Sequence, residues 1–258
     1  MGVSGTNFGK AAADYGKFRA GFPDSLFDRL RPFGIGLALQ HIVDLGTGTG
    51  TLARGFALRG CTVTGLDPDA RMLAQAQELD AQAGAQVRYV EATAEATGLN
   101  AAAADVVIAG QCWHWFDRPR AIEEVRRVLK PGGVLVIAHF DWLPLAGSVV
   151  AVTEALIQKH NPHWHLGGGM GLYPQWLPDL SAAGFADIET FSYDVAVRYP
   201  AEAWRGRIRA SAGVVALDAD AARHFDEEHG RMLTAQFPPL LETPHRIFAA
   251  IARHHDPH

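Results

Sequence analysis

The sequence Ile42-Val43-Asp44-Leu45-Gly46-Thr47-Gly48-Thr49-Gly50 decides the fold that we expect for this chain. An apolar, β-branched run leads into closely spaced glycines, and residues 49–59 then carry apolar side chains at helical spacing. Glycine adopts positive φ without strain and lets a ligand approach the backbone closely. A helix that begins here would add free N–H groups that point at the ligand. The stretch predicts a strand, a ligand-binding turn and a helix, because an ordinary tight turn rarely needs so many glycines.

The same alternation of strand and helix continues on both sides of this stretch. Helices are expected at residues 49–59, 69–82, 118–129 and 178–184, with a mostly helical stretch at 201–236. Strands are expected at residues 40–45, 61–66, 87–91, 105–109, 134–138, 186–197 and 245–252. Because helices of this length join parallel strands through right-handed crossovers, we expect an α/β fold. Its sheet should be doubly wound, mostly parallel, seven-stranded and Rossmann-like.

The second half of the chain departs from this regular pattern. Residues 139–180 are rich in Trp, His, Gly and Pro, and a helical stretch later separates the last two expected strands. We expect a single domain over residues 1–258, in which residues 139–180 and 198–240 are insertions that form a substrate lid.

Composition excludes several classes of protein. The chain has 258 residues, of which 48% are hydrophobic and 20% charged, so it can bury a full core and is not disordered. The net charge is −5, and no cluster of basic residues would give the positively charged surface that binds nucleic acid or an anionic membrane. No apolar run approaches the ~18 residues of a membrane span. With two distant cysteines and no signal-peptide pattern, a cytoplasmic protein is expected.

The strand after the glycine turn ends in a second informative residue, Asp67. A carboxylate at this place can accept hydrogen bonds from the ribose hydroxyls of a nucleotide cofactor. It could instead cap a helix that begins at Pro68. A dinucleotide site requires G-x-G-x-x-G/A, and Thr51 occupies the third position, so that match is incomplete.

Taken in order, these motifs resemble those of class I S-adenosylmethionine-dependent methyltransferases that act on small molecules. Residues 44–50 match the family's first motif, Asp67 matches its ribose-binding acid, and Met72 falls where an apolar side chain covers the adenine. Ala94-Glu95 resembles the motif after the third strand, although Thr93 stands where the family often has Asp. Residues 105–116 resemble the fourth motif, at the methionine end of the cofactor, and residues 129–133 resemble the turn before the fifth strand.

The resemblance spans about residues 8–140 and implies a cofactor site. Residues 1–37 should form an N-terminal segment that covers the cofactor. The cofactor, S-adenosyl-L-methionine, should contact Tyr15, Arg19, Asp44, Gly46, Thr47, Gly48, Gly50, Asp67, Pro68, Met72, Ala94, Glu95 and Gln111. The expected activity is transfer of its methyl group to a small-molecule acceptor, aromatic or partly apolar. The alternatives are a catalytically silent cofactor-binding regulatory protein and, less favoured, an NAD-dependent oxidoreductase.

Methyl transfer needs a base only when the acceptor must lose a proton. His114 is the candidate, because it follows the fourth strand and histidine titrates near neutrality. It could instead pack between its tryptophan neighbours. The expected substrate contacts are Trp113, Trp115, Trp142, His165 and Tyr173. An alternative is that a small core of the insertions themselves contains Trp142, Trp164, Phe140 and Tyr173.

Two clusters in the second half admit more than one interpretation. His160, His163 and His165 could bind a transition metal, but no cysteine or carboxylate pattern supports such a site, so a lid is favoured and no metal is expected. The arginines of Trp204-Arg205-Gly206-Arg207-Ile208-Arg209 could hold an acidic substrate. A solvated helical face is the favoured interpretation, because Arg205 and Arg209 are one turn apart.

Overall fold

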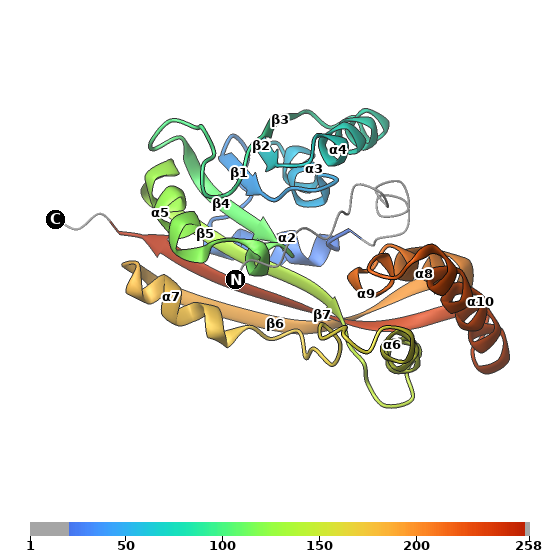
Figure 1. Cartoon of the computed structure of the whole chain (residues 1–258). Coiled ribbons are helices and arrows are strands. Elements are labelled where there is room, and N and C mark those ends of the chain that lie inside the picture. The colour runs from blue at the N-terminus through green and yellow to red at the C-terminus, as the bar shows by residue number, and fades with distance from the viewer. Residues whose placement is uncertain (1–20, 256–258) are drawn as a thin grey trace. The chain divides into compact units, whose positions relative to one another are not determined.

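Seven strands form one sheet in the computed structural model, which describes residues 21–255 (Figure 1). The strand order is β3-β2-β1-β4-β5-β7-β6. The strands are β1 (His41–Leu45), β2 (Thr62–Asp67), β3 (Val87–Glu91), β4 (Ala104–Gly110), β5 (Leu129–Trp142), β6 (Phe185–Pro200) and β7 (Leu240–His254). All pairs from β3 to β5 are parallel, whereas β7 runs opposite to β5 in Figure 1. The expected mostly parallel, seven-stranded Rossmann-like sheet is confirmed.

The strand order reverses between β1 and β4. From β1 the chain moves outward to β2 and β3 and then returns to pair β4 with the free side of β1. In open α/β sheets, ligands bind outside the carboxyl ends of the strands at this switch point. The carboxyl end of β1 is Leu45, which leads directly into the glycine turn.

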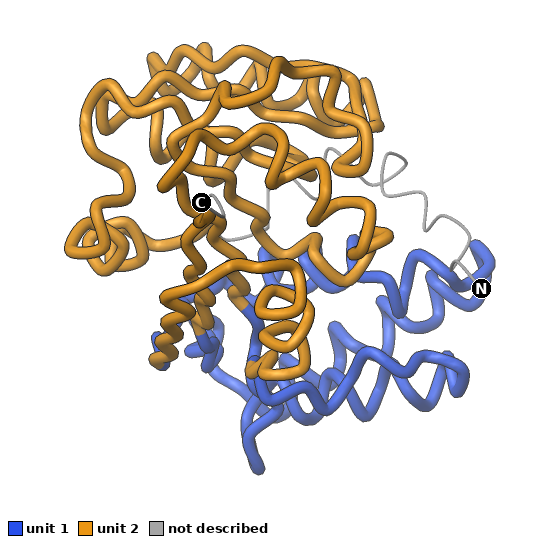
Figure 2. The backbone as a smooth tube through the Cα atoms, turned by 90° about the vertical axis from the view of Figure 1, so that its left-hand side faces the viewer, with its two compact units in different colours: residues 1–20, 141–171, 194–246 blue, residues 21–140, 172–193, 247–258 orange. Residues whose placement is uncertain are grey.

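The described chain divides into two compact units (Figure 2). One unit, the sheet unit, comprises described residues 21–140, 172–193 and 247–255. Besides strand residues it holds α2 (Asp24–Leu30), α3 (Thr51–Ala57), α4 (Ala70–Ala83), α5 (Arg118–Val128) and α7 (Leu177–Ala182). It also contains the short 3-10 helices η2 (Arg31–Phe33), η3 (Trp113–Trp115) and η4 (Pro174–Trp176). The other, the helical unit, comprises described residues 141–171 and 194–246. β5, β6 and β7 contribute residues to both.

Successive side chains of each strand point to opposite faces of the sheet, and both faces of the sheet unit are covered. Val43, Leu45, Val107 and Ala109 join one core cluster with apolar residues of α5 and α7. The intervening side chains are also buried but point to the other face, because successive residues of a strand alternate. There α3 packs on β1 and β2. The ring centroids of Phe27 on α2 and Phe56 on α3 lie 4.9 Å apart.

One expected turn became part of a strand. We expected Lys130-Pro131-Gly132-Gly133 to precede β5, but β5 already begins at Leu129. The pairing advances from Ala104–Leu129 directly to Val106–Val134, so residues 130–133 form a bulge in the ladder. Gly132 has φ +73°, which a glycine tolerates at such a bulge.

The helical unit has a core of its own. It contains α6 (Val149–His160), α8 (Ala201–Arg209), α9 (Ala212–Val215) and α10 (Ala219–Gln236). The last three account for the expected helical stretch 201–236, whereas α6 was not expected. Trp164 lies in this core and Trp142 packs against it, so both belong to a core of the insertions. Tyr173 instead packs against the core of the sheet unit, so the alternative was wrong for this residue. The lid function of residues 139–180 and 198–240, like the single domain, stays a prediction.

None of the helices within residues 21–255 is both long and apolar enough to cross a bilayer.

Candidate functional site

The glycine turn lies between β1 and α3 in the sheet unit. Gly46, Gly48 and Gly50 have φ values of +59°, +56° and +77°, which explains the spacing of the glycines: every second residue is left-handed. The turn is fixed from beneath, since the N–H of Thr47 donates to the carbonyl of Leu66 on β2 over 2.8 Å. Among residues 21–255, a Cβ added to Gly48 would meet only the Cε atom of Met72, at 3.4 Å. No other described side chain fills the outer side of the turn at Gly48.

Asp44 supports this turn from within the protein. Its side chain is buried, and its Oδ2 atom accepts hydrogen bonds from the Thr47 hydroxyl at 2.6 Å and the Ala53 N–H at 3.2 Å. Burial raises the pKa of Asp44 to about 7, although both hydrogen bonds oppose the shift. Asp44 thus joins β1, the turn and α3.

Asp67 connects the turn to the end of β2. Its Oδ2 atom accepts the N–H of Gly48 at 2.9 Å and its Oδ1 atom the N–H of Asp69 at 2.9 Å. Burial raises its pKa, and these two bonds partly counteract the rise. The cap of the following helix is Asp69, which accepts the N–H of Arg71, so the interpretation of Asp67 as the cap was wrong. A carboxylate has about four acceptor positions, so Asp67 can accept further bonds from a ligand.

The other expected cofactor residues of the sheet unit occupy different environments. Met72 is buried beside Gly48, and Pro68 is exposed. Ala94 is buried, and Glu95 accepts the N–H of Asp117 at 2.9 Å. Tyr15 and Arg19 lie outside the described residues. The cofactor roles of all these residues stay predictions.

The turn after β4 packs directly against the glycine turn. A Cβ on Gly46 would lie 2.9 Å from the Cβ of Cys112, and the Cys112 thiol donates to the carbonyl of Leu45 at 3.1 Å. Gln111 begins this turn with φ +58°, and its side-chain amide donates to the carbonyl of Phe140. The structure therefore brings the expected first and fourth motifs together.

His114 lies in the same turn, and its ring is exposed. Its centroid is 4.5 Å from that of Trp115 and 5.6 Å from that of His139. Trp113 has no exposed surface and packs edge-on against Phe116, so it belongs to the core of the sheet unit. Trp115 remains 42% exposed and can contact a ligand in this conformation. The substrate roles of both tryptophans stay predictions.

Sequence reasoning missed His139 as a neighbour of the expected base. It follows Ala138, which pairs with Gly110 in the parallel ladder, and its side chain is buried. Its ring centroid lies 4.2 Å from that of Tyr173, an expected substrate residue. Tyr173 in turn stacks on Trp176 with centroids 4.1 Å apart. The available signal was a polar residue directly after the expected strand 134–138.

Sequence reasoning also missed the network that holds the far side of the glycine turn. Arg54 on α3 donates to the carbonyl of Thr49 at 2.9 Å and forms an ion pair with Asp80 on α4 at 2.7 Å. Tyr89 on β3 donates its hydroxyl to the same carboxylate at 2.8 Å. Gly50 must lack a side chain here, because a Cβ would lie 2.2 Å from the Tyr89 hydroxyl.

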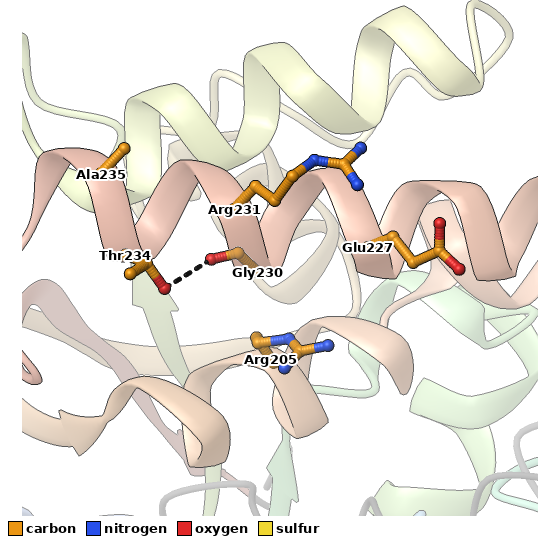
Figure 3. A pocket seen from close by; sticks show the side chains of 6 residues that line it. All are labelled: Arg205, Glu227, Gly230, Arg231, Thr234 and Ala235. Atoms are coloured by element: carbon orange, nitrogen blue, oxygen red, sulfur yellow. Dashed lines mark hydrogen bonds between the residues drawn. The ribbon is translucent and has the colours of Figure 1, made fainter.

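The remaining expected substrate residues, Trp142 and His165, belong to the helical unit. Trp142 donates its indole N–H to Glu154 at 2.6 Å. His165 lines a surface pocket of about 550 Å³ together with Glu154, Gln158 and Trp164. A second pocket, of about 470 Å³, lies between α8 and α10 and is lined by charged and small side chains (Figure 3). No residue of the glycine turn lines either pocket.

The histidine cluster does not form a metal site among the described residues, where no group of three potential ligands converges. His160 faces Glu228, with 2.8 Å between Nε2 and the carboxylate. His165 Nδ1 lies 3.2 Å from the carbonyl oxygen of His163.

Comparison with known proteins identifies relatives of this chain. The family described as "Methyltransferase domain" matches residues 43–137. An uncharacterized methyltransferase of Mycobacterium bovis is 38% identical over 196 residues, which cover 69% of this chain and 76% of that protein. A malonyl-[acyl-carrier protein] O-methyltransferase of Enterobacter lignolyticus is 36% identical over 145 residues, about half of each chain.

A solved structure extends the similarity over nearly the whole chain. It is a proposed type II methyltransferase from Anaeromyxobacter dehalogenans, 28% identical, with a TM-score of 0.68. The alignment covers 93% of this chain and 100% of that one. The similarity therefore includes residues on both sides of the matched domain.

Proposed function

Because the chain belongs to the class I S-adenosylmethionine-dependent methyltransferase family, we propose that it transfers the cofactor's methyl group to a small-molecule acceptor. One observation carries the proposal: the glycine turn, Asp67 and the turn after β4 meet at the switch point of the sheet. The cofactor supplies a methyl group on a sulfonium, which is already activated toward a nucleophile. The protein's main tasks are alignment and exclusion of water.

The residues present fit this cofactor. The outer side of Gly48 would admit the ligand to the backbone, and Asp67 would accept hydrogen bonds from the ribose hydroxyls. Met72, which is buried beside Gly48, would cover the adenine. The turn after β4, which packs on Gly46, would hold the methionine end.

His114 is the residue we assign to proton removal from the acceptor. Its exposed ring follows β4, next to Trp115, whose exposed surface can contact an aromatic or partly apolar acceptor. Only the neutral imidazole accepts a proton. The acceptor of the malonyl-[acyl-carrier protein] relative is not carried over, since this chain covers about half of that protein.

Incubation with cofactor labelled with tritium in the methyl group tests the proposal. We expect label in the product from at least one member of a panel of hydroxylated and amine-bearing metabolites, with stoichiometric S-adenosylhomocysteine. Calorimetric cofactor binding without label transfer to any panel member would contradict the proposal and favour the silent regulatory protein. Absorbance change of a nicotinamide cofactor would contradict it in favour of an oxidoreductase.

A further inference from the structure

Three arginines of α8 differ sharply in their partners. Arg205 and Arg209 bridge α8 to α10, with Asp226 at 2.6 Å and 3.1 Å, respectively. Both also pair with Glu202, at 2.8 Å and 3.2 Å. Their charges are therefore neutralised within the helical unit, and neither is available to hold an acidic ligand.

Arg207 points to a different side of the helix. Its guanidinium carbon lies 4.9 Å from the ring centroid of Trp142 at the end of β5. Its Nε atom is buried without a hydrogen-bond partner, and within residues 21–255 no carboxylate lies within ion-pair distance. Burial lowers the pKa of Arg207, whereas the neighbouring Tyr199 and Asp141 side chains oppose the shift.

A buried guanidinium keeps its charge and its five N–H donors. Its desolvation is unfavourable unless an anion pairs with it, and a cation over a tryptophan face recovers only part of this free energy. The neighbouring Asp141 charge discriminates between anions, because it repels a dianionic phosphate more strongly than a carboxylate. A singly charged, planar anion therefore suits Arg207 better than a dianion.

We propose that Arg207 binds the carboxylate of a small organic acid beside Trp142 and Tyr199. Arginine suits this group because its planar fork donates two parallel hydrogen bonds to the two carboxylate oxygens. The role of this acid as the methyl acceptor rests on the proposed function. Binding of the acid at Arg207 does not depend on the proposed function.

Binding of matched acids and amides tests this site. Benzoate, phenylacetate and 4-hydroxybenzoate are each titrated against the corresponding primary amide, with and without S-adenosylhomocysteine, and followed by tryptophan fluorescence and ligand-detected NMR. We expect at least one acid to bind at least tenfold more tightly than its amide. A ratio below threefold for every pair would overturn the proposal.

Two variants test whether Arg207 causes the preference for the acid over the amide. Arg207→Met should bring the ratio of acid to amide affinity below threefold, whereas Arg209→Met, on the paired face of the same helix, should preserve it. Should Arg207→Met lose its circular-dichroism signature of folding, Arg207→Lys replaces it. Lysine keeps the charge but lacks the fork, so we expect the ratio to fall at least threefold. An unchanged ratio in the folded Arg207 variant would overturn the site.

The outcomes separate this site from the proposed function. Acid binding that depends on Arg207, without transfer of label from the cofactor to any acid or other acceptor, contradicts methyl transfer but not the site. Transfer of label to acceptors without an acidic group, at rates unaffected by Arg207→Met, contradicts the site alone.

Discussion

The glycines of the turn after β1 each adopt a left-handed backbone conformation, and their surroundings differ. Gly46 faces Cys112, Gly48 faces the side that we assign to the cofactor, and Gly50 faces Tyr89. The spacing of glycines predicted this turn, since few residues other than glycine adopt positive φ without strain. The neighbours of each glycine depend on packing between distant segments and had no local signal.

Gly48→Val should leave the protein folded but weaken cofactor binding at least 100-fold. A β-branched side chain resists positive φ and would occupy the side of the turn that the ligand needs. Gly84→Val is the matched control, because Gly84 has φ +69° and nothing within 4 Å of an added Cβ. Calorimetric titration should show cofactor affinity lost in Gly48→Val alone. Equal affinities in both variants would remove the turn from the binding site.

His114→Asn should retain cofactor affinity and lose about 10²- to 10⁴-fold in turnover, the usual contribution of a general base. The wild-type rate should also fall at acidic pH, because imidazolium cannot accept a proton. His41→Asn is the control, since His41 is exposed at the opposite end of β1. Turnover of His114→Asn within about threefold of wild type at every pH would exclude His114 as the base.

Among the elements, α3, α4 and β3 are joined by a polar network. Arg54, Asp80 and Tyr89 lie far apart in sequence, yet their side chains converge behind the glycine turn. The elements themselves were predictable from apolar spacing, but their side-chain network was not, because it depends on the register between β2 and β3. The start of β5 and the presence of α6 were missed because both depend on pairing and packing partners.

Gly50→Ala should lower the free energy of unfolding by about 2–4 kcal/mol, from left-handed strain and a clash with Tyr89. Gly34→Ala is the control, since Gly34 has φ +78° but open space around an added Cβ. It should show only the strain, about 1–2 kcal/mol. Combining Gly50→Ala with Tyr89→Phe should cost less than the sum of the single changes. If urea denaturation shows that the losses of unfolding free energy in the two single variants add up to the loss in the double variant, the clash is contradicted.

At the scale of the whole molecule, the sheet unit and the helical unit each have a hydrophobic core. The sheet unit contains all strongly matching motifs, which explains why its fold was predictable. The helical unit has weaker sequence signals, and its organisation depends on contacts between α6, α8 and α10. At their centre, Thr153 accepts the indole N–H of Trp204 at 3.1 Å and lies 3.1 Å from His229.

His229 should make the stability of the protein sensitive to acid. Burial lowers its pKa from 6.5 to about 4, so between these values the unfolded chain binds more protons than the folded one. The free energy of unfolding therefore decreases as the pH falls through this range, by about 2 kcal/mol between pH 7 and 4.5.

Chemical denaturation at both pH values checks this effect. His229→Gln removes the titrating group, so its free energy of unfolding should decrease by about 2 kcal/mol less than that of wild type between pH 7 and 4.5. His163 is exposed, so His163→Gln should behave like wild type. If the free energy of unfolding depends on pH identically in wild type and His229→Gln, His229 does not cause the acid sensitivity.

Cofactor binding by Asp67 is the most direct test of the central claim, that the glycine turn and the end of β2 hold S-adenosylmethionine. The measurement is calorimetric titration of S-adenosylmethionine into wild type, Asp67→Ala and the control Asp69→Ala, which removes the half-buried cap of α4 and its ion pair with Arg71. Loss of hydrogen bonds to a charged group is worth about 1.5–3 kcal/mol. We therefore expect affinity to fall about 10- to 150-fold in Asp67→Ala and to change little in Asp69→Ala. Equal affinity of wild type and Asp67→Ala would contradict the claim.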